Sequence, residues 1–382
     1  MRVVLVGGAG EVGSEIARDL ALGQEIDELL IADLDRARAT ALADELGELH
    51  PNVSACELDV EDPVAARRRL ADADLLINCT SFTLFDRVLS LAAAVPVDYA
   101  DLISEPEDRH RAIAEEAGIT AISGLGASPG LSNVLVRHAA ESLDSLHEVE
   151  ISWISLRSVA PTPGLLDTIL WELSEDCTNR RYYRDGRYYR AEFMEGSRLV
   201  DFAAPVGRQH VYYVPHTEVT TLPRHFPALR HCAVRGSWRP ELMQDMSVLR
   251  RYGLLAEPAL GATKQAIWHS RGGDRDAAPW MLYVNVEVAG IRDGIEVRRT
   301  YAVSHPTDWG QRGVARMTGI TAAVGVQLLA RHGRAAAAGF IDPEEYYDPF
   351  EFLQELERRG SIVVECNEAP VQPDAETTRT PA

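Results

Sequence analysis

Three glycines near the amino terminus have a spacing that predicts a specific chemistry. Gly8, Gly10 and Gly13 follow the apolar run Arg2–Val6 in the pattern Gly-x-Gly-x-x-Gly, and apolar residues then recur every four positions. The first glycine permits a tight turn, the second lets the backbone approach a pyrophosphate, and the third lets a helix pack closely on a strand. Free N–H groups at the start of that helix attract phosphate. The pattern indicates a dinucleotide site, which also includes the intervening Glu11 and Val12.

An acidic residue stands where the second strand is expected to end. Asp33 follows the run Glu28–Ala32 and lies 20 residues beyond Gly13. A carboxylate there binds the adenosine ribose hydroxyls and repels a 2′-phosphate, so it favours NAD. Arg36 and Arg38 could instead receive that phosphate, which keeps NADP open. Further cofactor contacts are expected at the ends of the third and fourth strands: Asp59, Val60, Asn78, Cys79 and Thr80.

The segments around these residues alternate between strands and helices. Short apolar runs predict strands over Val53–Leu58, Asp74–Asn78, Val95–Tyr99 and Ile119–Ile122. Strands that alternate with amphipathic helices form parallel sheets with crossover helices. The fold class is therefore α/β, with an N-terminal, doubly wound sheet of the Rossmann type.

The pattern changes in the middle of the chain. His147–Leu156, Met281–Val288 and Glu296–Val303 are long strand-like runs, which favour antiparallel pairing. Leu165–Leu173 and Pro240–Tyr252 have helical spacing between them. This region is predicted to be a second domain of the α+β class.

Composition excludes several kinds of partner. The formal net charge of −20 disfavours nucleic acid and anionic membranes, and we find no run of the ~18 apolar residues that a membrane span needs. The five cysteines have no Cys-x-x-Cys spacing, which predicts free thiols in a reducing compartment. We expect a cytoplasmic protein.

Four histidines invite a metal interpretation, which their spacing does not support. His210, His216, His225 and His231 lie six, nine and six residues apart, and this matches no compact ligand set. We expect no metal.

Several motifs carry a resemblance to a known family. Gly124–Asn133 matches a Gly-x-x-Pro-Gly-Leu-x-Asn turn, and Thr220–Pro227, Arg316–Gly319 and Gly339–Glu344 continue the match over nearly the whole chain. With these motifs the chain resembles the saccharopine dehydrogenase-like family, and it looks closest to the L-lysine 6-dehydrogenase branch.

The resemblance implies an NAD(P)-dependent oxidoreductase acting on a C–N bond of an amino acid, as an amine dehydrogenase or imine reductase. A saccharopine- or opine-type reductase, which condenses an amino acid with a carbonyl compound, is an alternative. A non-catalytic dinucleotide sensor is another. The family also implies a homodimer and a small-molecule amine or amino-acid substrate.

The family also implies how the chain is divided. Residues 1–133 would form the Rossmann domain, 134–309 an inserted substrate and dimerisation domain, and 310–366 a helical segment that returns to the Rossmann domain. Residues 367–382 are rich in proline, threonine and acidic residues and are expected to be disordered.

Amine oxidation needs a base near the nitrogen and a rigid holder for the substrate carboxylate. Side chains beyond the strand ends and on the second domain could supply them. The catalytic candidates are Asp101, Tyr99, Glu218 and Arg239, and the substrate-binding candidates are Ser81, Thr221, Arg224, Arg235 and Trp238.

Most candidates also have a structural interpretation. Tyr99 and Asp101 could cap the helix that begins near Glu105. Glu218 could pair with Arg224 on the surface, and Arg235 could belong to a structural ion pair.

One segment departs from the family pattern. Relatives carry Arg-Tyr-Pro-Gly-His where this chain has Arg235-Gly236-Ser237-Trp238-Arg239. An arginine cannot act as a base near neutrality, whereas a histidine can. Arg239 is therefore expected to hold an anionic group of the substrate, which would carry more negative charge than lysine does.

Overall fold

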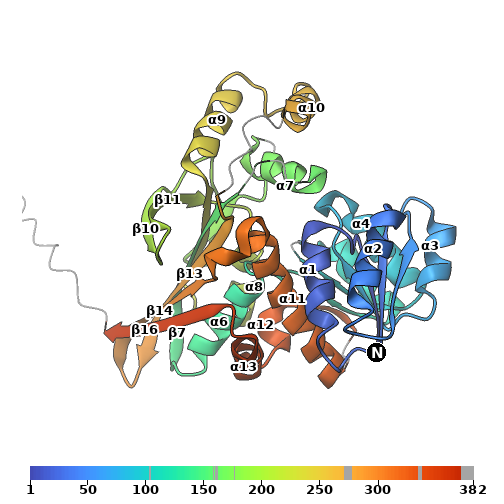
Figure 1. The fold of residues 1–382 in the computed structure, drawn as a ribbon. Coiled ribbons are helices and arrows are strands. Elements are labelled where there is room, and N and C mark those ends of the chain that lie inside the picture. Colours follow the sequence, from blue (N-terminus) through green and yellow to red (C-terminus); the bar gives the residue numbers. More distant parts are fainter. Residues whose placement is uncertain are drawn as a thin grey trace, which may run out of the picture.

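Two β-sheets organise the molecule (Figure 1). The computed structural model describes residues 1–102, 105–157, 159, 162–175, 177–270, 278–333 and 338–370. Seven parallel strands form the first sheet, in the order β15-β6-β5-β4-β1-β2-β3. They are β1 (Arg2–Val6), β2 (Glu28–Asp33), β3 (Val53–Glu57), β4 (Leu75–Asn78), β5 (Asp98–Asp101), β6 (Thr120–Ile122) and β15 (Gly339–Ile341).

Helices cover both faces of this sheet, as its central strand shows. Val3 and Leu5 of β1 enter one hydrophobic core, and Val4 and Val6 enter another. The helices of this region are α1 (Glu11–Leu20), α2 (Arg36–Leu46), α3 (Pro63–Leu70), α4 (Phe85–Ala94) and α5 (Asp108–Ala117). The predicted doubly wound Rossmann sheet is confirmed. β5 begins three residues later than predicted, because Val95 caps α4 and Pro96 separates it from the strand.

The second sheet has nine strands, seven of which follow the order β10-β11-β12-β7-β13-β14-β16, while a hairpin of β8 and β9 joins β12. The strands are β7 (Ser145–Leu156), β8 (Arg181–Arg184), β9 (Arg187–Arg190), β10 (Arg198–Phe202), β11 (Gly207–Tyr213), β12 (His231–Trp238), β13 (Met281–Arg292), β14 (Ile295–Ser304) and β16 (Val363–Pro370). The accompanying helices are α6 (Leu131–Ala140), α7 (Pro163–Leu173), α8 (Glu218–His225), α9 (Pro240–Arg251) and α10 (Leu260–Ser270).

The antiparallel pairing predicted for the long strands is confirmed for β13 with β7 and with β14, but β7 also has a parallel neighbour that the sequence did not predict. β7 and β12 are parallel neighbours, with His231 opposite Glu148 and Trp238 opposite Ser155. The chain between them passes through α7 and α8. Parallel neighbours need such a crossover, so the central pair of the sheet differs from its antiparallel flanks.

The last part of the chain connects both sheets. After the 3₁₀ turn η2 (Thr307–Arg312), α11 (Gly313–His332) packs against α1, and a Cβ at Gly319 would lie 2.6 Å from the Cβ of Glu15. β15, α12 (Pro343–Tyr346) and α13 (Pro349–Arg359) follow. By length and composition Thr307–His332 could cross a membrane, but 83% of its most apolar window is buried. It is a core helix here.

The final strand departs from the division expected from the sequence. β16 pairs with β14 in the second sheet over Val363–Pro370, a stretch assigned above partly to the segment returning to the Rossmann domain and partly to a disordered tail. Backbone pairing with a long edge strand orders this polar stretch, although it has no apolar periodicity. Residues 371–382 lie outside the described part of the chain.

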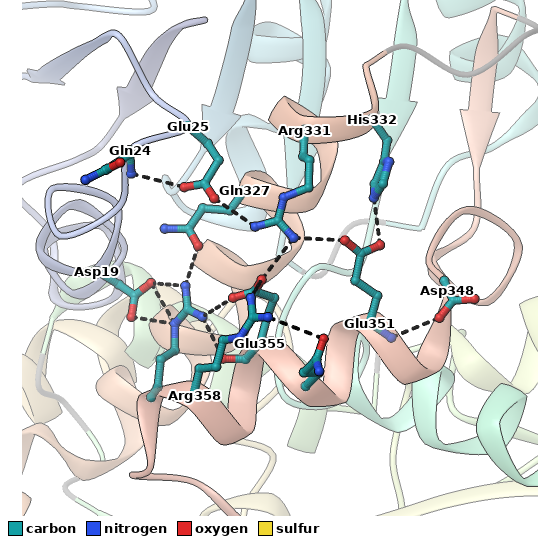
Figure 2. A network of polar contacts seen from close by, with 12 residues as sticks. Asp19, Gln24, Glu25, Gln327, Arg331, His332, Asp348, Glu351, Glu355 and Arg358 are labelled. Carbon is teal, nitrogen blue, oxygen red and sulfur yellow. Dashed lines mark hydrogen bonds and ion pairs between the residues drawn. The ribbon is translucent and has the colours of Figure 1, made fainter.

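A network of ion pairs fastens α13 to α11 and α1 (Figure 2). Arg359 donates to both carboxylate oxygens of Asp19 at 2.8 to 3.0 Å. Arg331 lies within 2.9 Å of Glu25, Glu351 and Glu355. We call this cluster the α11–α13 ion network; its members are Asp19, Glu25, Gln327, Arg331, His332, Glu351, Glu355, Arg358 and Arg359.

Candidate active site

A cavity of about 820 Å³ lies between the two sheets. One part is lined by the glycine loop and the carboxyl ends of the first sheet's strands. The other part is lined by the start and inner face of α7, the ends of β7 and β12, and the first turns of α11. The cavity therefore lies at the predicted position, beyond the carboxyl ends of the strands of the parallel sheet.

The glycine loop is built to admit a pyrophosphate. Gly7 has φ +75°, and a Cβ at Gly13 would lie 2.6 Å from the Gly7 carbonyl oxygen. A Cβ at Gly8 would lie 2.9 Å from the Leu5 carbonyl oxygen. Gly10 caps α1 and lines the cavity together with Glu11 and Val12. The contacts at Gly8 and Gly13 leave no room for a side chain and pack the loop tightly against β1 and α1, while Gly7 and Gly10 present backbone to the cavity. The residues present therefore fit this cofactor.

Asp33 and an arginine share the adenosine end of the cavity. Asp33 accepts hydrogen bonds from the backbone N–H groups of Ala9 and Asp35, both at 3.0 Å. Arg38 donates to the Ala9 carbonyl at 2.6 Å and lines the cavity. Arg36, in contrast, does not line the cavity. A carboxylate suited to a ribose diol thus lies close to a cation suited to a phosphate.

The ends of β3 and β4 complete this wall. Asp59, Val60, Cys79 and Thr80 line the cavity. Asn78 is buried behind them and accepts hydrogen bonds from the Thr80 backbone N–H at 3.0 Å and from its hydroxyl at 2.6 Å. Burial, with the nearby carboxylates of Asp33 and Asp101, raises the pKa of Cys79 to about 12, so this cysteine lines the site as a neutral thiol.

Tyr99 and Asp101 do not line the cavity as the described residues form it. The Tyr99 hydroxyl donates to Asp101 at 3.0 Å and accepts from Asn78 at 3.1 Å. Burial and the Asp101 charge hold the pKa of Tyr99 well above its ordinary value. Asp101 also accepts from the Ser123 hydroxyl at 2.9 Å. The pair holds the turn that leads to the cavity, and the helix cap of α5 is Glu107 instead.

The arginines predicted to bind substrate also lie outside the cavity lining. Arg224 pairs with Asp342 at 3.0 Å, and Arg235 pairs with Glu150. Arg239 is the half-buried residue before α9. Thr221 is buried and accepts a hydrogen bond from Asn133 at 3.1 Å.

Two substrate candidates do reach the cavity. Ser81 lies at its edge, and its Cα is 3.7 Å from the Cβ position of Gly164 at the start of α7. Trp238 meets Trp153 edge to face, with ring centroids 5.0 Å apart. A Cβ at Gly236 would lie 2.2 Å from the Trp153 ring. Gly236 therefore makes room for the two indoles.

The second-domain wall carries buried polar atoms without partners. Trp153, Ser155 and Arg157 alternate along the end of β7 and line the cavity, as does Glu172 of α7. Trp153 Nε1, Ser155 Oγ, Arg157 Nε and Glu172 Oε2 are buried and form no hydrogen bond with described residues. Buried polar groups are nearly always paired, so a cluster of exceptions calls for a bound partner.

Opposite charges on this wall are adjacent but incompletely paired. Burial lowers the pKa of Arg157, against the effect of the Glu11 and Glu172 carboxylates. Burial raises the pKa of Glu172, while His216, Arg157 and Arg180 oppose that rise. A substrate with one anionic and one cationic group would satisfy both residues.

His216 completes the wall, next to a predicted residue. It lines the cavity and stacks on Trp153 with ring centroids 5.4 Å apart and a 27° interplanar angle. Glu218, predicted as catalytic, is fully buried behind it and does not line the cavity. Its nearer oxygen is 3.7 Å from His216 Nδ1.

α7 covers the cavity from the second domain. Residues at its start and along one face line the space. Its Trp171 ring lies 5.0 Å from Phe82, which follows β4 in the first domain. The helix therefore contacts the Rossmann domain across the cavity.

A further cluster lies away from this site. His225, Asp342 and Glu344 each place one potential ligand atom within 4.8 Å of the others, among the residues that the structure describes. The Asp342 carboxylate already binds Arg224 at 3.0 Å and His225 at 2.9 Å. Arg224 and His225 thus already bind the carboxylate that a cation would need.

Sequence reasoning missed Arg157, Glu172 and His216. Alternation within the strand over His147–Leu156 was a usable signal, because it places Trp153, Ser155 and the following Arg157 on one face. No comparable pattern identifies His216, which lies in a loop.

Comparisons with known proteins agree over nearly the whole chain. Residues 3–122 match the saccharopine dehydrogenase NADP binding domain, and residues 126–362 match the saccharopine dehydrogenase C-terminal domain. A carboxyaminopropylagmatine dehydrogenase from Synechocystis sp. is 23% identical over 94% of this chain and 96% of its own length. A saccharopine dehydrogenase [NADP(+), L-glutamate-forming] from Saccharomyces cerevisiae is 29% identical over 38% of this chain and 31% of its own length.

One solved structure shares the fold in full. The apo saccharopine dehydrogenase (L-Glu forming) from Saccharomyces cerevisiae superimposes with a TM-score of 0.71 at 17% identity. The superposition covers 97% of this chain and 100% of that chain.

Proposed function

Because the chain belongs to the saccharopine dehydrogenase family and is an NAD(P)-binding oxidoreductase, we propose that it acts on a C–N bond of an amino acid. The observation that carries the proposal is the set of four unpaired buried polar atoms at the second-domain end of the cofactor cavity. The dinucleotide supplies or accepts a hydride when bound. The wall must then hold the substrate carbon and nitrogen next to it.

Arg157 is the group that binds a substrate carboxylate. It is about nine-tenths buried, and the described residues give it no hydrogen bond or ion pair. The Glu11 and Glu172 carboxylates offset part of the cost of burying this charge, and two parallel hydrogen bonds from the guanidinium to a substrate carboxylate would offset more of it. We therefore propose that Arg157, which lines the cavity, binds the anionic group of the substrate in place of Arg239, which does not line it.

Glu172 is placed to bind the amino group. Its Oε2 is buried without a partner, and its carboxylate is close enough to Arg157 for their charges to interact. An amino acid presents a carboxylate and an ammonium two bonds apart, so a paired cation and anion match its two ends. The indoles of Trp153 and Trp238 would border the carbon between them.

In the oxidative direction the substrate carbon loses a hydride and the nitrogen loses a proton, which leaves an imine. Water can then add to the imine carbon and release an amine and a carbonyl compound. The reductive direction reverses these changes. The residues of this chain must exclude bulk water, hold the carboxylate and exchange the proton on nitrogen.

A condensing reductase is a second candidate, favoured by a specific observation. The relative that matches over 94% of this chain is named for a carboxyaminopropyl group joined to agmatine. The dehydrogenase relatives give no support to the sensor alternative.

We propose NAD as the preferred cofactor, because Asp33 lies in the cavity where a ribose diol would bind. We further propose, from the resemblance and the composition, a homodimer in the cytoplasm. A 42 kDa particle in light scattering would contradict the dimer.

A turnover screen tests the proposal. Amino acids are offered singly with NAD⁺ or NADP⁺, and pairs of an amino acid or polyamine with an aldehyde or keto acid are offered with the reduced cofactors. Ammonia release from one amino acid supports the amine dehydrogenase, and reduced-cofactor consumption only with two organic substrates supports the condensing reductase. The proposal fails if the protein binds the cofactor tightly but turns over neither set of substrates, or if it turns over only alcohols.

A further inference from the structure

We infer that His216 exchanges the proton with the substrate nitrogen and that Glu218 and Ser128 are its positioning residues. The inference rests on the proposed function, which supplies a nitrogen that must gain or lose a proton. It assigns a catalytic role to an imidazole that faces the cavity, and it moves Glu218 from predicted catalyst to the residue behind that catalyst.

The imidazole is held from one side and open on the other. Nδ1 lies 3.3 Å from the Ser128 hydroxyl oxygen and 3.7 Å from Glu218 Oε2. The described residues offer Nε2 no hydrogen bond, and the ring lines the cavity. A base whose other nitrogen is fixed by a third group is the usual arrangement for proton transfer.

The hydrogen bonds around Ser128 determine the tautomer. Glu218 Oε1 accepts a 2.6 Å hydrogen bond from the Ser128 hydroxyl and a 2.7 Å hydrogen bond from the Ser132 hydroxyl. A serine hydroxyl has one hydrogen to donate, and here the carboxylate receives it. The Ser128 oxygen can therefore only accept from His216, so Nδ1 carries the hydrogen and Nε2 is the nitrogen that gains or loses a proton.

Charged groups from two other elements line the cavity with His216, and the Glu172 carboxylate is close enough to act on the ring. Glu172 of α7 and Arg157 at the end of β7 line the same cavity, and Trp153 covers one face of the imidazole. Burial lowers the pKa of His216, but the carboxylates of Glu218 and Glu172 outweigh it and hold the pKa above its ordinary value. Although burial raises the pKa of Glu218, His216 and the serine hydroxyls lower it overall.

These charges suit proton donation in the reductive direction. As the imine carbon gains a hydride, His216 Nε2 gives its proton to the nitrogen, and the imidazole becomes neutral. In the oxidative direction the neutral imidazole takes that proton back. Other groups are less suited, because burial keeps Cys79 and Tyr99 protonated and arginine does not titrate.

The experiment compares His216→Asn, Glu218→Gln and Ser128→Ala in the reductive direction across pH. We expect His216→Asn to lower kcat by about 10²- to 10⁴-fold and to abolish the alkaline fall in kcat/KM. Glu218→Gln and Ser128→Ala should move that fall to lower pH, because the imidazolium loses its counter-charge or its fixed orientation. His210→Asn is the matched control, since His210 is exposed and outside the cavity.

A readout without turnover separates this inference from the proposed function. NMR titration measures the pKa of the His216 ring, whose signals are identified by their absence in His216→Asn. This pKa should lie above the ordinary value for histidine, and it should be lower in Glu218→Gln than in the unmodified protein. Dinucleotide binding, followed by tryptophan fluorescence, should survive in each variant. An alkaline fall that persists in His216→Asn but disappears in Glu172→Gln, or a His216 pKa unaffected by Glu218→Gln, would overturn the assignment.

Discussion

Two clusters of charged side chains in this protein are built in opposite ways. In the α11–α13 ion network the arginines and carboxylates are paired with one another, as in the contacts of Arg359 with Asp19 and of Arg331 with three glutamates (Figure 2). On the cavity wall Arg157 and Glu172 lie near each other, yet each keeps a buried polar atom without a hydrogen bond. In the first cluster the charged groups find their partners within the chain, and on the cavity wall some buried polar atoms do not.

From this difference we infer which polar groups serve the fold and which would serve a ligand. An unpaired buried polar group costs about 1 to 3 kcal/mol, and more when it is charged. A fold can keep such a group where a substrate later supplies the partner. The α11–α13 ion network should therefore control stability with little effect on binding, and the cavity wall should do the reverse.

Replacing Arg157 should give the largest change in kcat/KM. Arg157→Met keeps much of the side-chain volume and removes the charge, so kcat/KM should fall by about 10²- to 10³-fold, as for loss of one partner of a buried charge pair. The melting temperature should stay the same or rise, because an unpaired buried cation has been removed. Steady-state kinetics and thermal unfolding check this, and a large loss of stability with unchanged kcat/KM would reverse the comparison.

Arg359 should show the opposite pattern. Its side chain is 15% exposed, and Asp19 beside it is 10% exposed, so Arg359→Ala should lower the free energy of unfolding by about 1 to 3 kcal/mol. The kcat/KM at a temperature where the variant is folded should stay within twofold. Arg358→Ala is the matched control, because its side chain is 59% exposed and it should cost about 0.5 kcal/mol or less. An equal loss of unfolding free energy in Arg359→Ala and Arg358→Ala would contradict this expectation.

Glu344 sharpens the comparison, because it has a buried, unpaired oxygen outside the cavity. Burial, with the Asp342 charge, raises its pKa to about 7. A proton on this carboxyl group can therefore remove the buried charge, and no ligand is needed to do so. The folded state binds this proton more tightly than the unfolded state. Glu344 should therefore lower the stability progressively as pH rises from about 4.5 to 7, and Glu344→Gln should reduce that slope. Denaturant titrations at several pH values measure it, and an unchanged slope would exclude Glu344 as its source.

Cofactor choice should show the smallest effect. Asp33→Ser removes the carboxylate that conflicts with a 2′-phosphate while Arg38 remains nearby. The ratio of the NADPH to NADH dissociation constants should fall by about tenfold, which is about 1.4 kcal/mol. Fluorescence titration provides both constants. Tighter binding of NADPH by the unmodified enzyme would refute the NAD preference.

The sequence predicted the Rossmann sheet because its signals are local. The glycine spacing, the position of Asp33 and the period of the apolar residues all lie within short segments, and the sheet forms as predicted. The wall opposite the cofactor depends on distant segments. Ser128, Trp153, Glu172 and His216 meet only after β7, α7 and the loop before α8 have packed together.

The candidate substrate-binding arginines also show that a residue's role depends on distant segments that the sequence pattern does not reveal. Arg224 and Arg235 have the right chemistry for a carboxylate, but Asp342 and Glu150 already neutralise them. Residue type alone does not distinguish an arginine paired within the fold from one left for a ligand. Arg157, one residue beyond β7, differs from them only in its surroundings.

The most direct test of the account asks whether Arg157 recognises a carboxylate. The amino acid turned over best is compared with the matching amine that lacks only the α-carboxylate, using kcat/KM for the unmodified enzyme and for Arg157→Met. The account predicts a strong preference for the amino acid in the unmodified enzyme and a loss of at least tenfold in that preference in the variant. An unchanged preference would show that another group binds the carboxylate and that the unpaired wall does not form the substrate site.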